Sequence, residues 1–470
     1  MLFLKDEVFM TSTKDRKFLF EKEKISKAVL TLAIPTIISQ LITIIYNWAD
    51  TFFVGQLNDT YQMAAVTICH PAFMMCTAFA NLIGIGGANV ISRAMGANKI
   101  DRAKKTSTTC MLFVFLFSII YSLIIFLIRE PLLLNVLGAD STTIEYCYDY
   151  MFWVVVIGSL PTILSATFAH LIRATGKATQ SSIGITVGAI LNIILDPIFI
   201  FVFGLEVEGA AIATCISNAV ACIYFIIYLI IQKQKETILN FNPTNLKIKS
   251  KVSLDILSSG LSSFLMLLMA IFSNASINKL MSSYSAAAIS GVSIAKKVDL
   301  CIIAFAQGLS NGILPLVGYN FASGDKKRMH KIIKFSMTLV LTFSISCIVL
   351  FFLFPRPIVS IFIKDTETID FASSFLRILC VSMPLTAILF IFNTVFQGTK
   401  QNGKALVTIV LRKGIVDIPL MIALNLVIPI YGVVMSQPIV DVIGTIVGLI
   451  LYIGYMRKEK KLLKEQELAF

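Results

Sequence analysis

The chain has 470 residues, of which 57% are hydrophobic and 14% are charged, and its formal net charge is +13. Soluble domains carry about 25% charged residues, so a soluble fold of this composition could not cover its surface. The composition predicts an all-α polytopic membrane protein, because helices satisfy their own backbone hydrogen bonds inside a bilayer. The nine cysteines and three histidines are scattered singly, so the sequence indicates neither a disulfide framework nor a zinc site.

Apolar runs of about 20 residues, each long enough to cross a bilayer, follow a basic N-terminal segment, 1–27. The first six predicted spans are 28–54, 64–91, 108–128, 151–171, 181–203 and 209–231. A polar segment with five lysines, 232–252, predicts a cytoplasmic linker. The next six predicted spans are 253–278, 286–317, 332–354, 372–396, 404–427 and 431–455. A basic tail, 456–470, ends the chain.

Short motifs recur at an offset of about 222 residues, which indicates a duplicated unit rather than a solenoid. Asp196-Pro197, for example, returns as Asp417-Ile-Pro419. The repeat predicts two six-helix lobes, 28–231 and 253–455. Because each lobe has an even number of spans, the lobes run in the same direction and are related by a pseudo-two-fold axis along the membrane normal.

The distribution of positive charge predicts the orientation of the chain. The two ends and the links on one side of the predicted membrane, with Lys334 and Lys404 at the adjoining ends of two spans, hold 31 of the 40 lysines and arginines. Positive links lie in the cytoplasm, so both termini are expected there. This bias accounts for the net charge, and no nucleic-acid partner is needed to explain it.

The fifth predicted span places polar residues on one helical face, because Gly184, Gly188, Asn192 and Asp196 are spaced by four. The glycines predict close packing against a neighbouring helix, which we expect to be the first span. A carboxylate at membrane depth costs about 2.5–3.5 kcal/mol on insertion scales and needs a partner, a proton or a cation. Asp50 is the other such carboxylate in this lobe, so the two are predicted to share one cation- or proton-binding site. An aspartate at a helix end near the outer interface is the plainer alternative.

The second lobe carries both signs of charge at membrane depth: Lys296, Lys297, Asp299, Arg412, Lys413, Asp417 and Asp441. We expect Lys296 and Lys297 to pair with Asp299. Arg412 and Lys413 lie about one turn from Asp417 and are expected to neutralise it. The positive and negative charges of this lobe then compensate one another. The secondary site candidates are Lys296, Asp299, Arg412 and Asp417.

The sequence favours a transporter over an enzyme. The segment 398–404 resembles a phosphate-binding loop, but it is followed by Ala405 instead of Ser or Thr and joins two membrane spans without a strand. No paired-aspartate, Ser/His or His-Glu-x-x-His arrangement of an intramembrane protease is present. We therefore expect no catalytic residues, no cofactor and no structural metal.

Five motifs together carry a resemblance to a known family. They are Tyr46-Asn-Trp-Ala-Asp50, Arg93-Ala-Met-Gly96-Ala-Asn98, Arg173-Ala-Thr-Gly176, Asn192-Ile-Ile-Leu-Asp196-Pro197 and Gly209-Ala-Ala-Ile-Ala-Thr214. With these motifs the chain resembles the multidrug and toxic compound extrusion (MATE) family over nearly its whole length. The family resemblance implies twelve helices in two lobes that form a V around a central cavity.

The resemblance also implies a function: export of amphipathic, often cationic, drugs or toxins against entry of H+ or Na+, with consequent antibiotic resistance. In the branch that this chain resembles, the cation site would comprise Asp50, Asn192, Asp196 and Thr214, and Pro35 matches a proline at which the first helix bends. The sequence does not choose between the two ions. We expect a monomer in the plasma membrane, surrounded by lipid.

Two alternatives remain open. Another branch of the family uses acidic residues on spans seven and ten, where this chain has Asn274, Asn278 and no acid. A flippase of a lipid-linked oligosaccharide, from the same superfamily, would use cations such as Arg173 and Arg412 to hold a diphosphate. A channel or receptor would not need a duplicated lobe with a protonatable pocket.

Overall fold

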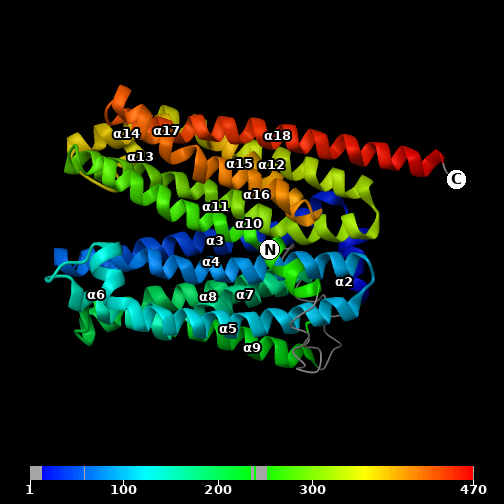
Figure 1. Cartoon of the computed structure of the whole chain (residues 1–470), viewed down its shortest axis with the longest axis horizontal. Coiled ribbons are helices and arrows are strands. Elements are labelled where there is room, and N and C mark those ends of the chain that lie inside the picture. The colour runs from blue at the N-terminus through cyan, green and yellow to red at the C-terminus, as the bar shows by residue number, and fades with distance from the viewer. Residues whose placement is uncertain (1–12, 58, 234–237, 240–250, 469–470) are drawn as a thin grey trace. The chain divides into compact units, whose positions relative to one another are not determined.

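The computed structural model describes residues 13–57, 59–233, 238–239 and 251–468. Over these residues the chain is all-α, without a strand, so the predicted fold class is confirmed (Figure 1). Most of the predicted linker and the first twelve residues lie outside the described parts of the chain.

Helices follow one another with short links. In the first half they are α2 (Thr13–Glu21), α3 (Ile25–Gly55), α4 (Thr60–Gly96), α5 (Ile100–Leu132), α6 (Ile144–Met151), α7 (Ser159–Ala174), α8 (Ala178–Pro197) and α9 (Glu206–Lys233), with the π-helical turns η1 (Leu133–Leu137), η2 (Phe152–Ile157) and η3 (Ile198–Val202). In the second half they are α10 (Lys251–Met281), α11 (Ala286–Ser323), α12 (Lys326–Leu353), α13 (Pro355–Val359), α14 (Thr366–Cys380), α15 (Met383–Gly398), α16 (Asn402–Val410), η5 (Leu411–Ile415), α17 (Asp417–Val427) and α18 (Tyr431–Leu468).

Eleven of the twelve expected spans correspond to long apolar helices within the described residues. Nine are continuous by length and composition, and two are pairs bent by 45° and 47°, at the breaks between η2 and α7 and between α14 and α15. The remaining expected span, 404–427, is divided among α16, η5 and α17. Its break coincides with the charged residues Arg412, Lys413 and Asp417, which take their partners inside the protein.

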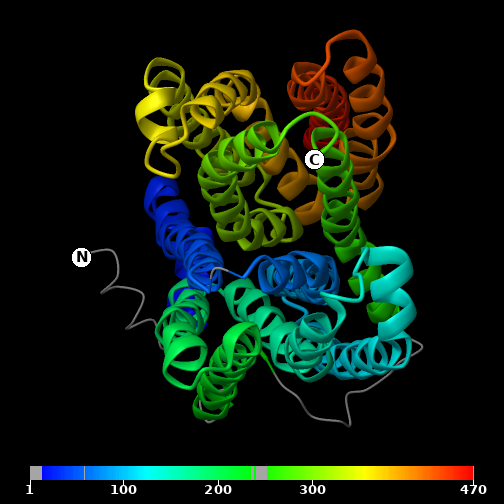
Figure 2. The same cartoon turned by 90° about the vertical axis from the view of Figure 1, so that its left-hand side faces the viewer.

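The chain divides into two compact units, which are described separately. The first unit contains residues 1–268 and 311–332, and the second contains 269–310 and 333–470. In the first unit, α4 packs on α5 and α7, while α8 packs on α3 and α9. Figure 2 views these helices along their axes. Glycines bring backbones into contact, since a Cβ at Gly260 of α10 would lie 1.8 Å from the carbonyl oxygen of Leu82 on α4.

The short helix α2 is held against α11 and α12 within the first unit. Phe20 is 1% exposed and stacks on Tyr319, with 4.8 Å between ring centroids. Arg328 donates from Nε to the carbonyl oxygen of Phe20 at 2.7 Å and from Nη2 to that of Glu23 at 2.6 Å. The Tyr319 hydroxyl donates to Glu21 at 2.8 Å. These contacts, which we call the N-terminal clamp, lie in a segment that its composition marked only as basic.

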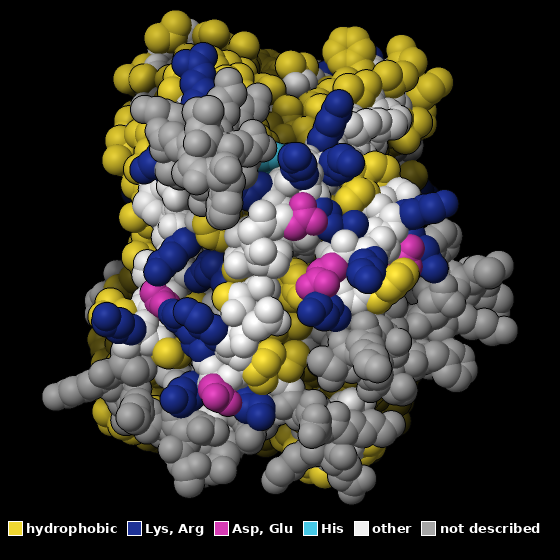
Figure 3. Space-filling view, turned by 90° about the vertical axis from the view of Figure 1, so that its right-hand side faces the viewer, with side chains coloured by type: hydrophobic (Ala, Val, Ile, Leu, Met, Phe, Trp, Pro, Cys, Tyr) yellow, Lys and Arg dark blue, Asp and Glu magenta, His cyan; other side chains and the backbone are white. Residues whose placement is uncertain are grey.

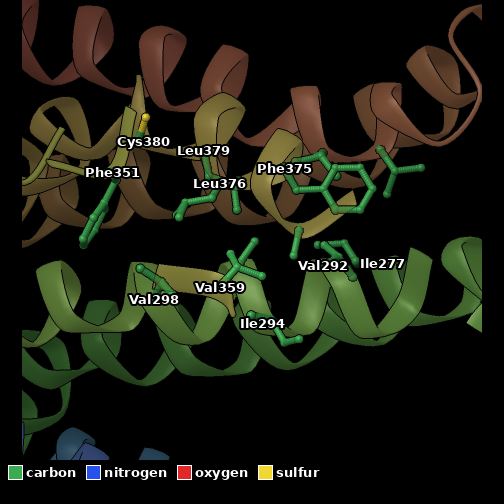
Figure 4. Close-up of a cluster of buried hydrophobic side chains, with 14 of the residues drawn as sticks. Ile277, Val292, Ile294, Val298, Phe351, Val359, Phe375, Leu376, Leu379 and Cys380 are labelled. Carbon is green, nitrogen blue, oxygen red and sulfur yellow. The ribbon is translucent and has the colours of Figure 1, made fainter. Parts of the chain in front are cut away.

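The second unit has its own apolar core. Phe375, Leu376 and Leu379 of α14 face Val292 and Val298 of α11, and all five side chains are buried (Figure 4). Lipid tails are as apolar as these side chains, so close van der Waals packing holds such a core together in a membrane. Charged side chains inside this unit are therefore confined to specific contacts, which are described below.

Candidate cation-binding site

The polar face predicted for the fifth span is buried. Gly184, Gly188, Asn192 and Asp196 all point into the protein from α8. The opposite face of the helix exposes Ile183, Val187, Ile190 and Ile194. The four-residue spacing therefore identified the inward face correctly.

The partner of the two glycines was predicted wrongly. A Cβ at Gly184 would lie 2.3 Å from Cζ of Phe225, and one at Gly188 would lie 3.1 Å from Cβ of Ala221. Both neighbours belong to α9, whereas we expected the first span. The small-residue spacing predicts a close contact but carries no information about which helix makes it. The first span, α3, also packs on α8, where Ser39 Oγ donates to Ser182 Oγ at 3.4 Å.

Three helices bring the four expected site residues together. Asp196 is 0% exposed, Asn192 2% and Thr214 7%. Asn192 on α8 donates from Nδ2 to Oγ1 of Thr214 on α9 at 3.2 Å. Asp50 on α3 lies close enough to Asp196 for their charges to interact. Residues separated by up to about 160 positions in the sequence thus face one another.

Several oxygen atoms of this cluster are buried without a hydrogen-bond partner among the described residues. They are Oδ1 of Asp50, Oδ1 of Asn192 and both carboxylate oxygens of Asp196. Leaving such groups unpaired in an apolar interior is costly. Carboxylate and amide oxygens accept from a proton donor or bind a monovalent cation, and a proton on either carboxylate would turn it into a donor. These oxygen atoms fit a small cation as ligands, and no cationic side chain belongs to the cluster.

Two tyrosines that sequence reasoning missed lie beside the carboxylates. Tyr46 precedes Asp50 by one turn on α3, and Tyr150 is a buried residue of α6. Both interact electrostatically with Asp50 and Asp196. The spacing of four residues from Asp50 could have pointed to Tyr46. Nothing in the sequence pattern connects Tyr150 to the site.

Apolar packing closes one end of the site. Val54 of α3, Ile200 of η3 and Ala210 of α9 form a buried cluster just beyond Asp50 and Asp196. The π-helical turn η3 follows Pro197 directly, and π-turns inside helices recur at functional sites. Pro35 lies far from this end, and α3 runs through it as a single helix.

The charges of the second unit pair differently from the prediction. Lys413 contacts Asp417 at 3.6 Å, as expected. Arg412, however, donates from Nε to Asp441 at 2.6 Å and not to Asp417. The expected contact between Lys296 and Asp299 is not formed within the described residues, because Lys296 instead donates to Asn274. The directions of the side chains in η5 and α11 determine which groups pair. The spacing of the charged residues in the sequence could not predict these partners.

The arginines required by the flippase alternative are already engaged. Arg412 is paired with Asp441, and the buried Arg173 donates from Nη2 to Ser181 at 3.0 Å. The Ser181 hydroxyl in turn donates to the carbonyl oxygen of Ala169, so this arginine helps to close the turn between α7 and α8.

The long apolar helices define a polytopic α-helical membrane protein. The sequence profile of the MatE family matches residues 35–198 and 261–423, one segment in each predicted lobe. The chain therefore belongs to the MATE family, whose members are transporters rather than enzymes.

Curated relatives and solved structures agree with this assignment. The chain is 30% identical over 440 residues to the multidrug export protein MepA of Staphylococcus haemolyticus, covering 93% of this chain and 95% of the relative. It is 28% identical to MepA of Staphylococcus aureus, over 97% of this chain and 99% of the relative. An outward-facing multidrug resistance MATE transporter superposes with a TM-score of 0.88 at 21% identity, over 96% of this chain and 99% of that one. A transporter of the MOP superfamily from Pyrococcus furiosus gives 0.84 at 22% identity, over 95% and 98%.

Proposed function

We propose that this protein is a secondary active multidrug exporter that moves amphipathic, often cationic, compounds out of the cell against entry of H+ or Na+. The observation that carries the proposal is the cluster of Asp50, Asn192, Asp196 and Thr214, whose buried oxygens lack a compensating cation. The names of the MepA relatives support multidrug compounds as the substrate class.

The cluster supplies a reason for ion coupling. Two carboxylates in one low-dielectric pocket cannot both ionise cheaply, so binding of a proton or a Na+ lowers the free energy of the conformation that holds them together. A ligand shifts a conformational equilibrium only by its differential affinity for the two states. A filled cation site then favours one opening of the transporter, and an empty site favours the other. The exported compound uses the change to the opening that the empty site favours.

We further propose the membrane arrangement that this function requires. The chain forms two six-helix lobes, 28–231 and 253–455, acts as a monomer and has both termini in the cytoplasm. Lysine and arginine side chains are frequent on the face shown in Figure 3, which supports a cytoplasmic location for the links on that face, since cytoplasmic links are enriched in these residues.

Efflux from liposomes tests the proposal. Purified protein is reconstituted into liposomes loaded with a fluorescent lipophilic cation, and a proton gradient or a Na+ gradient is imposed separately. We expect one of the two gradients to drive dye movement, and its collapse by an ionophore to stop it. Movement of an undecaprenyl-linked lipid without movement of cationic dyes would replace the exporter by the flippase.

A further inference from the structure

Two carboxylates of the second unit have hydrogen-bond and ion-pair partners. Asp441 of α18 accepts from Arg412 Nε at 2.6 Å and from Thr386 Oγ1 at 2.8 Å. Asp417 of α17 accepts from Ser273 Oγ at 2.6 Å and contacts Lys413 at 3.6 Å. Both carboxylates are nearly inaccessible to solvent. They need no further cation for compensation.

Lys296 of α11 is engaged differently. Its ammonium donates to the neutral side-chain oxygen of Asn274 at 2.8 Å, in an exposed hydrogen bond. No carboxylate among the described residues lies within ion-pair distance of it. An ammonium has three donors, and the contact with Asn274 uses one. Two donors are left for a ligand.

A second lysine lies next to Lys296. Lys413 is close enough for the two positive charges to interact, with Asp417 and Asp299 also among the electrostatic neighbours of Lys296. The side chain of Lys413 is 17% exposed and that of Asp417 only 1%, so the lysine presents the accessible part of their pair. Two neighbouring ammonium groups repel each other, and an anion bound between them would relieve that repulsion.

Both lysines lie near the middle of the predicted membrane. Lys296 follows the start of α11 by about 15 Å along the helix, and Lys413 follows the start of α16 by about 16 Å, at 1.5 Å per residue. The hydrocarbon core is about 30 Å thick. Cations at this depth face a protein interior or a water-filled cavity and mark substrate or ion pathways.

The backbone at Lys413 is adapted to this arrangement. Arg412 and Lys413 lie in η5, a π-helical turn between α16 and α17. The turn allows adjacent side chains to diverge, so that Arg412 reaches α18 while Lys413 stays beside Asp417. Such turns are rare and recur at functional sites.

We propose that Lys296, with Lys413 beside it, forms a subsite for the carboxylate of an amphipathic substrate. The subsite would act on zwitterionic substrates, which carry both an amine and a carboxylate. This inference rests on the proposed export function and assigns the residues that would bind one group of the substrate. The carboxylate of the substrate accepts from the free donors of Lys296 while its apolar body and cationic part bind elsewhere in the transporter.

A matched pair of dyes tests the subsite. A rhodamine with a free benzoic carboxylate is a zwitterion, and its methyl ester is a cation of nearly the same shape. Efflux of both is measured from proteoliposomes containing the wild type, Lys296→Gln, Lys296→Arg or Lys297→Gln. The last variant removes a neighbouring charge on the same helix and serves as the control.

For Lys296→Gln we expect the efficiency of zwitterion efflux to fall about tenfold or more, the loss that corresponds to one charge-assisted hydrogen bond. Efflux of the ester should stay within about twofold of wild type. Lys296→Arg should restore much of the zwitterion efflux, and Lys297→Gln should resemble wild type. Anisotropy of each dye on the purified protein gives a second measure of binding that does not depend on ion coupling.

The outcomes separate the two proposals. Equal loss of both dyes in Lys296→Gln would mean that the lysine only compensates internal charge, and the subsite would be wrong. Export of the ester but not of the zwitterion by the wild type would also overturn the subsite while leaving the exporter intact. Export of neither dye by the wild type would overturn the exporter itself.

Discussion

The side-chain amide of Asn192 donates to the hydroxyl of Thr214 at 3.2 Å, which links α8 to α9 beside the buried carboxylate of Asp196. This bond fixes the orientation of the amide. Because Nδ2 is directed at Thr214, the Asn192 Oδ1 atom remains an acceptor without a partner among the described residues. Thr214 therefore determines that the Asn192 amide offers its oxygen to the site, and it also contributes a hydroxyl oxygen of its own.

Removal of the Thr214 hydroxyl should weaken the site selectively. In Thr214→Val the Asn192 amide loses its acceptor, at a cost of about 1–3 kcal/mol for an unpaired buried group. If Na+ is the coupling ion, the Na+ concentration for half-maximal efflux should rise about tenfold. Thr214→Ser keeps the hydroxyl and is the control. Wild-type efflux and thermal stability in the valine variant would exclude Thr214 from the site.

Asp50→Asn and Asp196→Asn should each reduce gradient-driven efflux to the level of protein-free liposomes. Each amide keeps the shape of the carboxylate and removes a charge that is costly to bury, so folding should be preserved. The double variant should be no worse than either single one, because residues that act as a unit are not additive. Gel filtration of the purified variants checks folding. Full coupled efflux by one single variant would remove that residue from the mechanism.

Gly184→Ala should destabilise the protein, since the added methyl group would collide with Phe225 of α9. Overpacking of this kind costs about 1–3 kcal/mol. Gly403→Ala, also in a helix, is the control, because nothing lies within 4 Å of its Cβ position and alanine is the better helix former by about 1 kcal/mol. Thermal unfolding in detergent should show a lower midpoint for the first variant alone. Equal midpoints would indicate that α8 and α9 separate easily.

Arg328→Ala should loosen the N-terminal clamp. The arginine donates to the backbone carbonyls of Leu19, Phe20 and Glu23. A hydrogen bond from a charged group contributes about 1.5–3 kcal/mol to stability. Limited tryptic cleavage near Lys22 should therefore become faster. Lys327→Ala, on the exposed side of the same helix, is the control. Unchanged cleavage in Arg328→Ala would show that α2 stays docked through its apolar contacts.

Cysteine labelling should establish the orientation. In a cysteine-free background, a cysteine at Asn240 should react only after the cells are made permeable, because the predicted linker is cytoplasmic; this position lies outside the described residues. A cysteine at Val136, which is highly exposed in η1, should react with an impermeant reagent in intact cells. The reverse pattern would invert the predicted topology.

The sequence by itself determined the class, the family and the inward face of the fifth span. These follow from composition, from repeated motifs and from the spacing of Gly184, Gly188, Asn192 and Asp196, all of which are local properties of the chain. Only the tertiary structure decided which groups meet: the glycines contact α9 and not α3, Arg412 pairs with Asp441, Tyr150 joins the carboxylates and α2 docks on α11 and α12. The physical reason is that helical periodicity specifies the direction of a side chain around its own axis. Its partner depends on how separate helices pack, bend and shift at π-turns, and that packing involves residues far apart in the chain.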